Sequence, residues 1–288
     1  IEALPAASSR LAECCGLRED TARRLLRALG ELGLVRVGES DVWHLTSRGA
    51  LLRRDHPQTL ADAALEYAGP FTKMWQRLPD ALRGSSWEPP DVFGEVAGDE
   101  RRREGHHRML RSYARHDYDG VVPMLQLRGD ERVVDAGGGL GVLAQAIVDA
   151  HPAVHVTVLE RPEVVGMAAS QTSGVRWQAG SLFEPWNLAA DAVVLTRVLH
   201  DWDDSQAHAI LMRAREAVAP GARLYVVEMV LSDDTMAGSL CDLHLLVATG
   251  GRERTLDAYR RLFASADFEL TEVRRVPTLP SILVAVAT

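Results

Sequence analysis

The carboxyl-terminal half of the chain alternates apolar stretches with helical stretches, and this alternation most restricts the folds open to it. Apolar segments predict five buried strands, over residues 132–137, 155–160, 175–181, 190–200 and 222–231. Helical patterns occupy residues 140–150 and 205–220 between them. Strands that alternate with helices pair in parallel and are covered by helices on both faces. We therefore expect an α/β domain with a doubly wound, mostly parallel, Rossmann-like sheet.

The last part of the chain departs from this alternation. A helical pattern over residues 255–268 is followed by two strand-like segments, residues 269–276 and 281–287. Consecutive strands joined by a short connection pair in antiparallel fashion. We expect these two segments to form a terminal hairpin.

The amino-terminal part follows a different pattern. Residues 19–33 carry apolar side chains at helical spacing and end at Gly33, a common stop for a helix. Residues 34–46 read as strand, turn and strand, with the turn at residues 38–41. Short helices followed by a hairpin are the winged-helix pattern. We expect a helical, winged-helix-like domain over residues 1–118 and the sheet domain over residues 119–288.

A glycine-rich turn joins the first strand of the sheet domain to its first helix. Glycine lets the backbone turn sharply and approach a ligand, and the start of the helix offers free N–H groups. Glu160 ends the second strand, where a carboxylate can accept both ribose hydroxyls of an adenosine. This arrangement predicts a nucleoside-type cofactor. The turn reads Asp-x-Gly-x-Gly-x-Gly and comprises Asp135, Gly137, Gly138, Gly139 and Gly141.

The spacing of this turn discriminates between cofactors. The dinucleotide fingerprint spaces its glycines as Gly-x-Gly-x-x-Gly in order to seat a pyrophosphate. The turn in this chain is one residue tighter, and the acid Asp135 comes directly before it. A carboxylate at that place would repel a pyrophosphate but would attract a cationic amino-acid group. The sequence therefore favours S-adenosylmethionine over NAD.

A second polar segment, His200-Asp201-Trp202, follows the fourth strand. Ligands bind outside the carboxyl ends of the strands in an open α/β sheet. A phenol, with a pKa of ~10, is a poor nucleophile until a base takes its proton, and histidine transfers protons near neutral pH. His200 is therefore a candidate general base, although a histidine that caps a helix or packs in the core would fit the same place.

Two carboxylates are candidates to orient this histidine. Glu228 lies inside an apolar strand, and buried acids are rarely unpaired. Glu253 lies in the loop before the last helix, where an ordinary surface acid is the alternative.

Together these segments resemble the plant caffeate-type O-methyltransferases and their bacterial relatives that act on aromatic natural products. The motifs that carry the resemblance are Asp-Ala-Gly-Gly-Gly-Leu-Gly at 135–141, Leu-His-Asp-Trp-Asp-Asp at 199–204 and Gly-Gly-Arg-Glu-Arg-Thr at 250–255. The resemblance implies S-adenosylmethionine-dependent methylation of a phenolic hydroxyl on a small aromatic intermediate; C- or N-methylation is the alternative. It also implies a homodimer formed through the winged-helix part. Members of that family begin with further helices, so we expect this chain to be shortened at its start.

The resemblance also assigns roles to particular residues. His200 would be the base, flanked by Glu228 and Glu253. Ser181 stands where the family has an aspartate near the adenine, and Thr196 stands where it has a lysine or serine. The cofactor would be bound by Asp135, Gly137, Gly138, Gly139, Gly141, Glu160, Arg161, Ser181, Leu182, Thr196 and Trp202. The acceptor would be contacted by Asp201, His244, His107 and Met109. We expect at least one of His106 and His107 to lie near the acceptor.

Composition excludes several other classes. The net charge of −8 argues against nucleic acid as the main partner, because phosphate binding needs a basic face. No apolar run approaches the roughly 20 residues of a membrane-spanning helix. The three cysteines, Cys14, Cys15 and Cys241, form no Cys-x-x-Cys pair and indicate neither disulfides nor a zinc site. We expect a cytoplasmic protein.

Two alternatives stay open at this point. A winged helix followed by a nucleoside-binding domain would also fit a transcription regulator, which the acidic charge and the His–Glu–Glu set oppose. His200, Asp201 and His244 would also fit a metal site with two histidines and one carboxylate, but we expect no metal.

Overall fold

The computed structural model describes residues 1–84, 87–118, 120–276 and 280–288. The chain divides into two compact units, Ile1–Ala68 and Gly69–Thr288. The boundary lies earlier than the division after residue 118 that we expected. Helices α5 (Pro70–Trp75) and α8 (Glu100–Asp117) pack against helices of the second unit, α13 (Ser239–Ala248) and α10 (Val142–Ala150). The packing of their side chains therefore places them with the sheet.

The first unit is a small sheet with helices packed on it. Its strands β1 (Ala6–Ala7), β2 (Val35–Val37) and β3 (Val42–Leu45) pair in the order β1-β3-β2, all antiparallel. The predicted helix and hairpin are confirmed, whereas β1 is too short to be recognised in the sequence. Leu11, Leu26, Val35 and Trp43 form the core of the unit. Its helices are α1 (Ser8–Cys15), α2 (Glu19–Glu31), the short η1 (Glu39–Asp41), α3 (Ser47–Ala50) and α4 (Ala61–Ala68).

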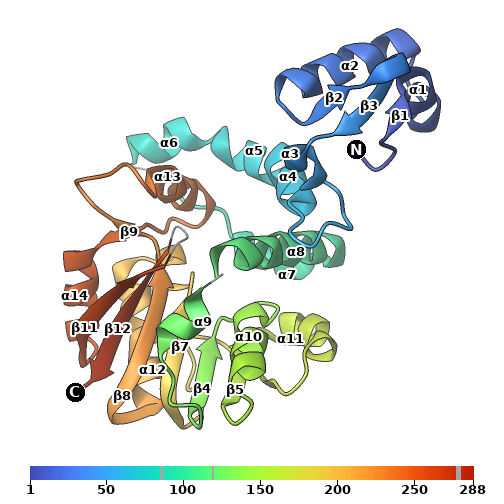
Figure 1. Ribbon diagram of the computed structural model, residues 1–288. Helices are drawn as coiled ribbons and strands as arrows, with labels where there is room; N and C mark the ends of the chain where they lie inside the picture. The colour runs from blue at the N-terminus through green and yellow to red at the C-terminus, as the bar shows by residue number, and fades with distance from the viewer. Residues whose placement is uncertain (85–86, 119, 277–279) are drawn as a thin grey trace. The chain divides into compact units, whose positions relative to one another are not determined.

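The second unit begins with helices and continues as a seven-stranded sheet (Figure 1). Among the described residues, no helix combines the length and the apolar character needed to cross a membrane. The opening helices, besides α5 and α8, are α6 (Leu78–Arg83), α7 (Val92–Gly98) and α9 (Val121–Leu125). Those between or after the strands are α10, α11 (Pro162–Ala168), η2 (Ala169–Gln171), η3 (Leu199–Asp201), α12 (Asp204–Glu216), α13 and α14 (Leu256–Ala264).

The sheet has the strand order β11-β12-β8-β7-β4-β5-β6. The five strands from β4 to β8 are parallel to one another, and β12 runs antiparallel to both β8 and β11. The mostly parallel α/β sheet and the terminal hairpin are therefore confirmed. The strands are β4 (Arg132–Ala136), β5 (His155–Glu160), β6 (Arg176–Ala179), β7 (Ala190–Thr196), β8 (Val218–Glu228), β11 (Phe268–Arg275) and β12 (Ser281–Ala287).

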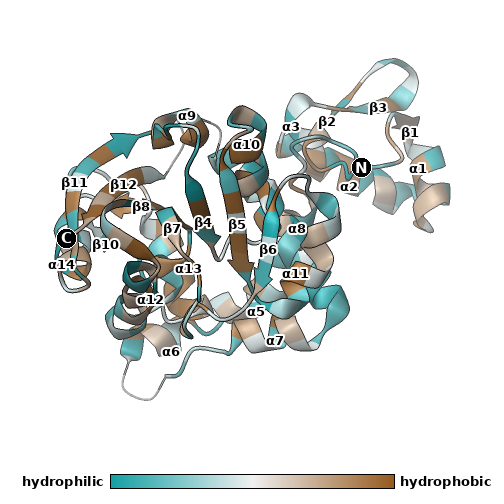
Figure 2. Cartoon of the chain, turned by 90° about the horizontal axis from the view of Figure 1, so that it is seen from below, coloured by the Kyte–Doolittle hydropathy of each residue, from teal (hydrophilic) through white to brown (hydrophobic). Residues whose placement is uncertain are grey.

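Apolar side chains on both faces hold the sheet between two helical layers. Alternate residues of β7 point to opposite faces, so Val193 packs with α12 and α14, whereas Val194 packs with α9 and α10. Figure 2 shows this apolar character most clearly along β5. Burial of a side chain of this size stabilises the fold by about 1.5–3 kcal/mol. The two-faced burial explains why these strands read as continuous apolar runs.

Several predicted elements end elsewhere in the structure. The fourth strand, predicted to residue 200, ends at Thr196, and His200 lies in η3. The helix predicted to residue 268 ends at Ala264, and Phe268 begins β11. The helix predicted to residue 220 ends at Glu216, because Val218 already pairs with Ala190 of β7 as the first residue of β8. The fifth strand ends at Glu228, and the separate β9 (Val230–Leu231) pairs in parallel with β10 (Arg254–Thr255). This short pairing brings the segments that follow Glu228 and Glu253 side by side.

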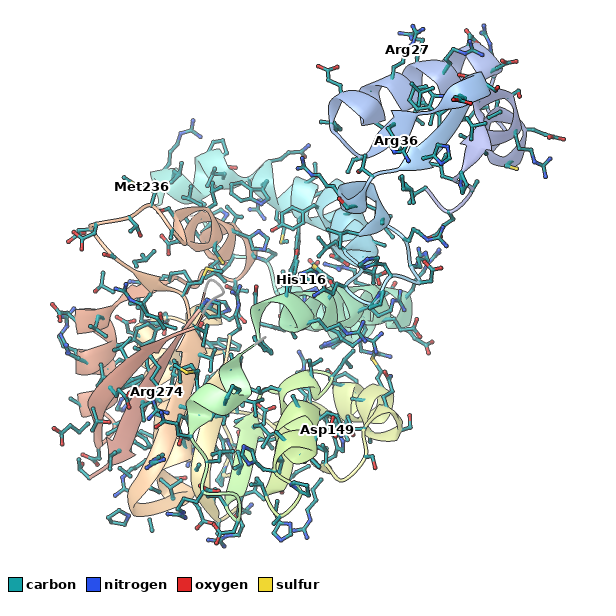
Figure 3. The ribbon with its side chains drawn as sticks, viewed as in Figure 1. Arg27, Arg36, His116, Asp149, Met236 and Arg274 are labelled. Carbon is teal, nitrogen blue, oxygen red and sulfur yellow. The ribbon has the colours of Figure 1, made fainter. Side chains whose placement is uncertain are left out.

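Arg274 fastens the edge strand β11 to the helical layer (Figure 3). Its guanidinium is buried and donates to the carbonyl oxygens of Leu125 (3.1 Å) and Met124 at the end of α9. Glu272 pairs with the same guanidinium at 2.6 Å. The antiparallel edge is therefore anchored to the face of the sheet that α9 covers.

Candidate active site

The carboxyl ends of four parallel strands lie along one edge of the sheet. Glu160, Thr196 and Glu228 are the last residues of β5, β7 and β8, and Asp135 is the penultimate residue of β4. Because these strands are parallel, the loops that follow them share this edge. The fold thus places the glycine turn and the His200 segment together, as expected for a ligand site in an open α/β sheet.

The glycine turn has the backbone conformation that its sequence requires. Gly137, Gly139 and Gly141 have φ values of +75°, +57° and +73°, in the left-handed region that favours glycine. A Cβ at Gly137 would lie 2.8 Å from the side chain of Val198, and one at Gly141 would lie 2.9 Å from Trp177. A Cβ at Gly139 would meet nothing within 4 Å, so a ligand can approach the backbone there.

Glu160 is held next to this turn by two backbone donors. The N–H of Gly139 donates to one carboxylate oxygen at 3.0 Å, and the N–H of Arg161 donates to the other at 2.8 Å. Burial raises the pKa of Glu160, although these two hydrogen bonds oppose the rise. The side chain of Arg161 donates to the carbonyl oxygen of Phe93 at 3.1 Å and so ties α7 to this edge.

Asp135 is a buried acid without a partner among the described residues. Its side chain is 1% exposed, and neither carboxylate oxygen accepts a hydrogen bond. Burial, with a smaller effect of Glu160, raises its pKa to about 7. A Cβ at Gly138 would lie 2.5 Å from this carboxylate, which explains the extra glycine. An orphaned acid beside an open glycine turn fits a cofactor with a cationic group, since an opposite charge favours the carboxylate form.

The residues predicted at the adenine end lie in neighbouring loops. The indole of Trp202 stacks on Phe93 with ring centroids 5.2 Å apart and meets the edge of Phe183 at 4.9 Å. The hydroxyl of Ser181 accepts from the backbone N–H of Phe183 at 3.2 Å, so it caps its own turn. Leu182 packs near Gly137, whose added Cβ would lie 3.6 Å from it. Thr196 is buried, and its hydroxyl has no hydrogen-bond partner in the described residues.

His200 lies at the centre of the second group. It is 4% exposed and belongs to η3, directly after β7. Its Nδ1 lies 3.0 Å from a carboxylate oxygen of Glu253 and 3.3 Å from one of Glu228. The hydrogen bond to Glu253 assigns the proton to Nδ1 and leaves Nε2 able to take another proton. Asp201 lies on the Nε2 side, with a carboxylate oxygen 4.0 Å away.

Glu228 also supports the backbone of the histidine turn. It is fully buried, and one of its oxygens accepts from the N–H groups of Val198 and Leu199, each at 3.0 Å. Burial raises the pKa of Glu228, and His200 opposes this rise. This carboxylate therefore contacts both the ring of the histidine and the chain that carries it.

Glu253 is held by helix α13 and faces Arg197, a half-buried arginine. Its backbone N–H donates to Asp242 of α13 at 2.8 Å. Burial raises its pKa to about 7, and Arg197 opposes the rise. Arg197 was not among the predicted residues, although it lies only three residues before His200. Its guanidinium lies 3.6 Å from the sulfur of Cys241 and 3.8 Å from Asp117.

The residues predicted to contact the acceptor fall into two places. His244 accepts a hydrogen bond from the indole of Trp75 (3.2 Å) and lies against Phe71, with ring centroids 4.6 Å apart. Burial lowers the pKa of His244 to about 4, so this imidazole is neutral. His106 joins the same cluster through Phe71, with ring centroids 6.4 Å apart.

The other two predicted acceptor contacts lie deeper in α8. His107 is 5.7 Å from His106 between ring centroids, but the charges that act on it are those of Arg103, Glu163 and Arg161, on the cofactor side. Met109 is 2% exposed and lies in the interior. Phe71 and Trp75 are thus acceptor candidates that helix packing reveals, and His106 is the one of the two adjacent histidines that lies beside Phe71.

The residues considered for a metal site do not assemble as a set. Among the described residues, His200 groups instead with Cys241 and Glu253, whose possible ligand atoms lie within 4.8 Å of one another. His244 is engaged with Trp75. The Nδ1 of His200 is bonded to Glu253.

A hollow of about 540 Å³ lies near the opposite ends of the strands. Arg132, Asp191 and Tyr225 are among the residues that line it, and Arg132 pairs with Asp191 at 2.9 Å. It contains none of the candidate catalytic or cofactor-binding residues. We therefore place the candidate site at the carboxyl edge, where the titratable groups converge, and not in this hollow.

Comparison with known proteins agrees with this geometry. Residues 75–269 match the model of the O-methyltransferase domain family. The chain is 32% identical over 272 residues to the mitomycin biosynthesis 6-O-methyltransferase of Streptomyces lavendulae, covering 90% of this chain and 78% of that protein. It is 34% identical to the O-demethylpuromycin-O-methyltransferase of Streptomyces alboniger, covering 89% and 73%.

Solved structures of other proteins have a similar fold. An O-methyltransferase from neocarzinostatin biosynthesis, solved with S-adenosylmethionine and 2-hydroxy-5-methyl naphthoic acid, superposes with a TM-score of 0.83 at 28% identity, covering 99% of this chain and 90% of that one. Human N-acetylserotonin methyltransferase has the same fold, with a TM-score of 0.90 at 24% identity, covering 98% and 87%. The chain therefore belongs to the O-methyltransferase family.

Proposed function

We propose that this enzyme transfers the methyl group of S-adenosylmethionine to a phenolic hydroxyl of a small aromatic natural-product intermediate, with His200 as general base. The observation that carries the proposal is the buried His200, whose Nδ1 faces Glu228 and Glu253 at the edge that holds the glycine turn. Relatives at 32% and 31% identity are named for 3-amino-4-hydroxybenzoate and for 2,7-dihydroxy-5-methyl-1-naphthoate, both hydroxylated aromatic acids.

In this proposal one group of residues binds the cofactor, and another takes the proton from the acceptor. The glycine turn, Asp135 and Glu160 hold S-adenosylmethionine, which supplies when bound a methyl group activated by a cationic sulfur. Nε2 of His200 accepts the proton of the acceptor hydroxyl, and the phenolate so formed is the nucleophile. Glu228 and Glu253 stabilise the imidazolium that results, because an adjacent carboxylate favours the charged form. Positioning supplies much of the remaining rate.

The ring cluster of Phe71, Trp75, His106 and His244 suits a planar aromatic acceptor. Aromatic side chains offer large apolar faces with defined geometry. Burial lowers the pKa of His106 to about 3 and that of His244 to about 4, so both imidazoles are neutral at physiological pH. Neutral imidazoles both donate and accept hydrogen bonds, and they can thus orient hydroxyl or carbonyl substituents of the acceptor.

The experiment that tests this function identifies the methylated atom. The enzyme is incubated with S-adenosylmethionine carrying a CD3 group and a panel of hydroxybenzoates, hydroxynaphthoates and their amino analogues. We expect an O–CD3 product, located by mass spectrometry and NMR. Methylation of nitrogen or carbon alone would favour the alternative; a solved relative with a TM-score of 0.80 is named as an aminoriboflavin dimethyltransferase, which makes nitrogen the stronger of the two.

We further propose a homodimer in the cytoplasm, formed through the winged-helix-like residues of the amino-terminal part, with a functional division near residue 118. The unit Ile1–Ala68 carries exposed apolar side chains at Leu25 (50%), Leu32 (61%) and Val37 (55%), which a partner copy would cover. We expect light scattering on the full-length protein to give twice the mass of one chain. A monomer at micromolar concentration, or tight binding of DNA in a gel shift, would contradict this assignment.

Asp135 predicts that cofactor affinity depends on pH. Its pKa is raised to about 7 chiefly by burial, so the carboxyl is mostly protonated below that pH, and binding of a cation then requires loss of the proton. We expect the Kd of S-adenosylmethionine to fall by up to about tenfold per pH unit between pH 5 and 7 and to level off above. Calorimetry in buffers of different ionisation enthalpy would measure the proton release.

The matched controls are Asp135→Asn and Asp149→Asn. The first removes the titrating group and should give weaker binding with a flat pH dependence. The second changes an acid at the end of α10, away from the turn (Figure 3), and should behave like the wild type. Equal pH dependence in the wild type and in Asp135→Asn would contradict the prediction.

A further inference from the structure

The Gly-Gly-Arg-Glu-Arg-Thr loop packs directly on the backbone of the histidine turn. The N–H of Arg252 donates to the carbonyl oxygen of His200 at 2.8 Å. A Cβ at Gly251 would lie 2.0 Å from the same oxygen, so only glycine permits this approach. The loop that supplies Glu253 to the imidazole ring therefore also contacts the main chain of the same histidine.

Arg254 extends this contact to both sides of His200. Its guanidinium is 2% exposed and donates to the carbonyl oxygens of Leu199 and Trp202, each at 2.8 Å. Its Nε donates to the carboxylate of Asp204 at 2.9 Å. A guanidinium offers several donors in a rigid plane, so it can hold two carbonyls and an acid at fixed separations, which the single ammonium of a lysine cannot do.

The histidine turn needs this support because its own hydrogen bonds are long. Within η3 and its flanks, the N–H of Asp201 donates to Val198 at 3.2 Å, and that of Trp202 donates to Leu199 at 3.3 Å. Short 3₁₀ turns have poorer hydrogen-bond geometry than α-helices. A general base must lie within about 2.6–3.2 Å of the proton that it takes. The position of the turn therefore decides whether Nε2 can reach the acceptor.

We propose that Arg254 is a positioning residue for methyl transfer: it fixes the backbone on both sides of His200, while its neighbour Glu253 fixes the ring. Through Trp202 the same guanidinium links the base to the residue at the adenine end. The inference rests on the proposed role of His200. One short segment, Glu253–Arg254, thus holds the ring and the main chain of the base together.

The test compares Arg254→Lys and Arg254→Gln with Arg252→Gln, using the best acceptor of the panel above. Arg252 is the matched control because its side chain is exposed and only its backbone N–H touches His200. Activities are normalised to the fraction of protein that binds S-adenosylhomocysteine. We expect kcat to fall about 10- to 100-fold in both Arg254 variants, as small displacements of a catalytic group cause, and to change little in Arg252→Gln.

The dependence of kcat on pH in the Arg254 variants distinguishes a positioning role of Arg254 from a role in the stability of the fold alone. Burial raises the pKa of Glu253 to about 7, while Arg197 and, more weakly, Arg254 oppose the rise. Cys241 and Asp242 also act on Glu253, and Asp204 and Tyr259 lie next to the Arg254 guanidinium. Arg254→Gln removes the charge, so the acid limb of kcat should move to higher pH. Arg254→Lys keeps the charge, so its limb should stay in place although its kcat is low.

Several outcomes would overturn the inference. A folded Arg254→Lys enzyme with the kcat of the wild type would show that the guanidinium geometry does not matter. An Arg254→Lys preparation with no fraction that binds S-adenosylhomocysteine would assign the residue to folding. His200→Ala, measured beside them, separates the proposed function from the further inference. Full turnover in His200→Ala would rule out His200 as the base. Loss of turnover in His200→Ala, together with wild-type turnover in Arg254→Lys, would rule out only the role of Arg254.

Discussion

His200→Ala should lower kcat for methylation of a phenolic acceptor by about 10³-fold, within the 10²–10⁴ range that a positioned base contributes. S-adenosylhomocysteine should still bind with nearly unchanged affinity, because the glycine turn and Glu160 do not depend on the imidazole. The reason for the loss is that a phenol with a pKa of ~10 is almost entirely protonated at neutral pH. Without Nε2, no group at the position of the imidazole accepts that proton.

The acidity of the acceptor makes this prediction specific to a general base. A phenol with electron-withdrawing substituents is already ionised at pH 8 and needs no base. The loss in His200→Ala should therefore shrink as the pKa of the acceptor falls. Steady-state rates across a series of substituted acceptors would measure this dependence.

His208→Ala provides the matched control for the histidine. This residue lies on α12, and its ring is bonded to the hydroxyl of Ser265 at 2.9 Å, outside the group around His200. It should keep the activity of the wild type. An unchanged kcat in His200→Ala, or a loss that is the same for every acceptor, would remove His200 from the role of base.

The parts of the site that were predictable from sequence are those fixed by local chemistry. A strand followed by Asp135 and a tight glycine turn has few possible backbone paths, because Gly137, Gly139 and Gly141 all need positive φ. His200 follows the fourth strand, and parallel strands place such segments at one edge. Local pattern and sheet topology therefore led to the same edge.

The parts that sequence did not reveal depend on contacts between distant segments. Arg254 reads as an ordinary arginine until the β9–β10 pairing brings it beneath Leu199 and Trp202. The ring cluster around His244 depends on how α5 packs against α13, which no periodicity encodes. The compact unit that contains both helices begins at Gly69. Such placement is decided by tertiary contacts.

The two glutamates that flank His200 were predicted to act alike, yet their contacts differ. Glu253 makes the shorter contact with Nδ1, 3.0 Å against 3.3 Å for Glu228. One oxygen of Glu228 accepts hydrogen bonds from the N–H groups of Val198 and Leu199, which belong to the turn that carries His200. We therefore propose that Glu253 acts mainly on the charge of the ring and that Glu228 acts mainly on the position of the turn.

Glu253→Gln and Glu228→Ala should accordingly fail in different ways. In Glu253→Gln the amide oxygen can still accept from Nδ1, but the imidazolium loses a counter-charge, so kcat should fall about 10²-fold, at the low end of the contribution of a positioned base. Because the amide is close in size to the carboxylate, the melting temperature should stay near that of the wild type.

In Glu228→Ala two buried N–H groups lose their acceptor, and each such group costs about 1–3 kcal/mol of unfolding free energy. The melting temperature should therefore fall clearly, and kcat should fall with it because the turn moves. Glu228→Gln is the control: its amide oxygen restores the acceptor for Val198 and Leu199, so most of the stability should return while kcat stays reduced. Calorimetry and steady-state kinetics on all three variants test the division of roles. It is contradicted if Glu253→Gln is the less stable protein or if Glu228→Gln melts as low as Glu228→Ala.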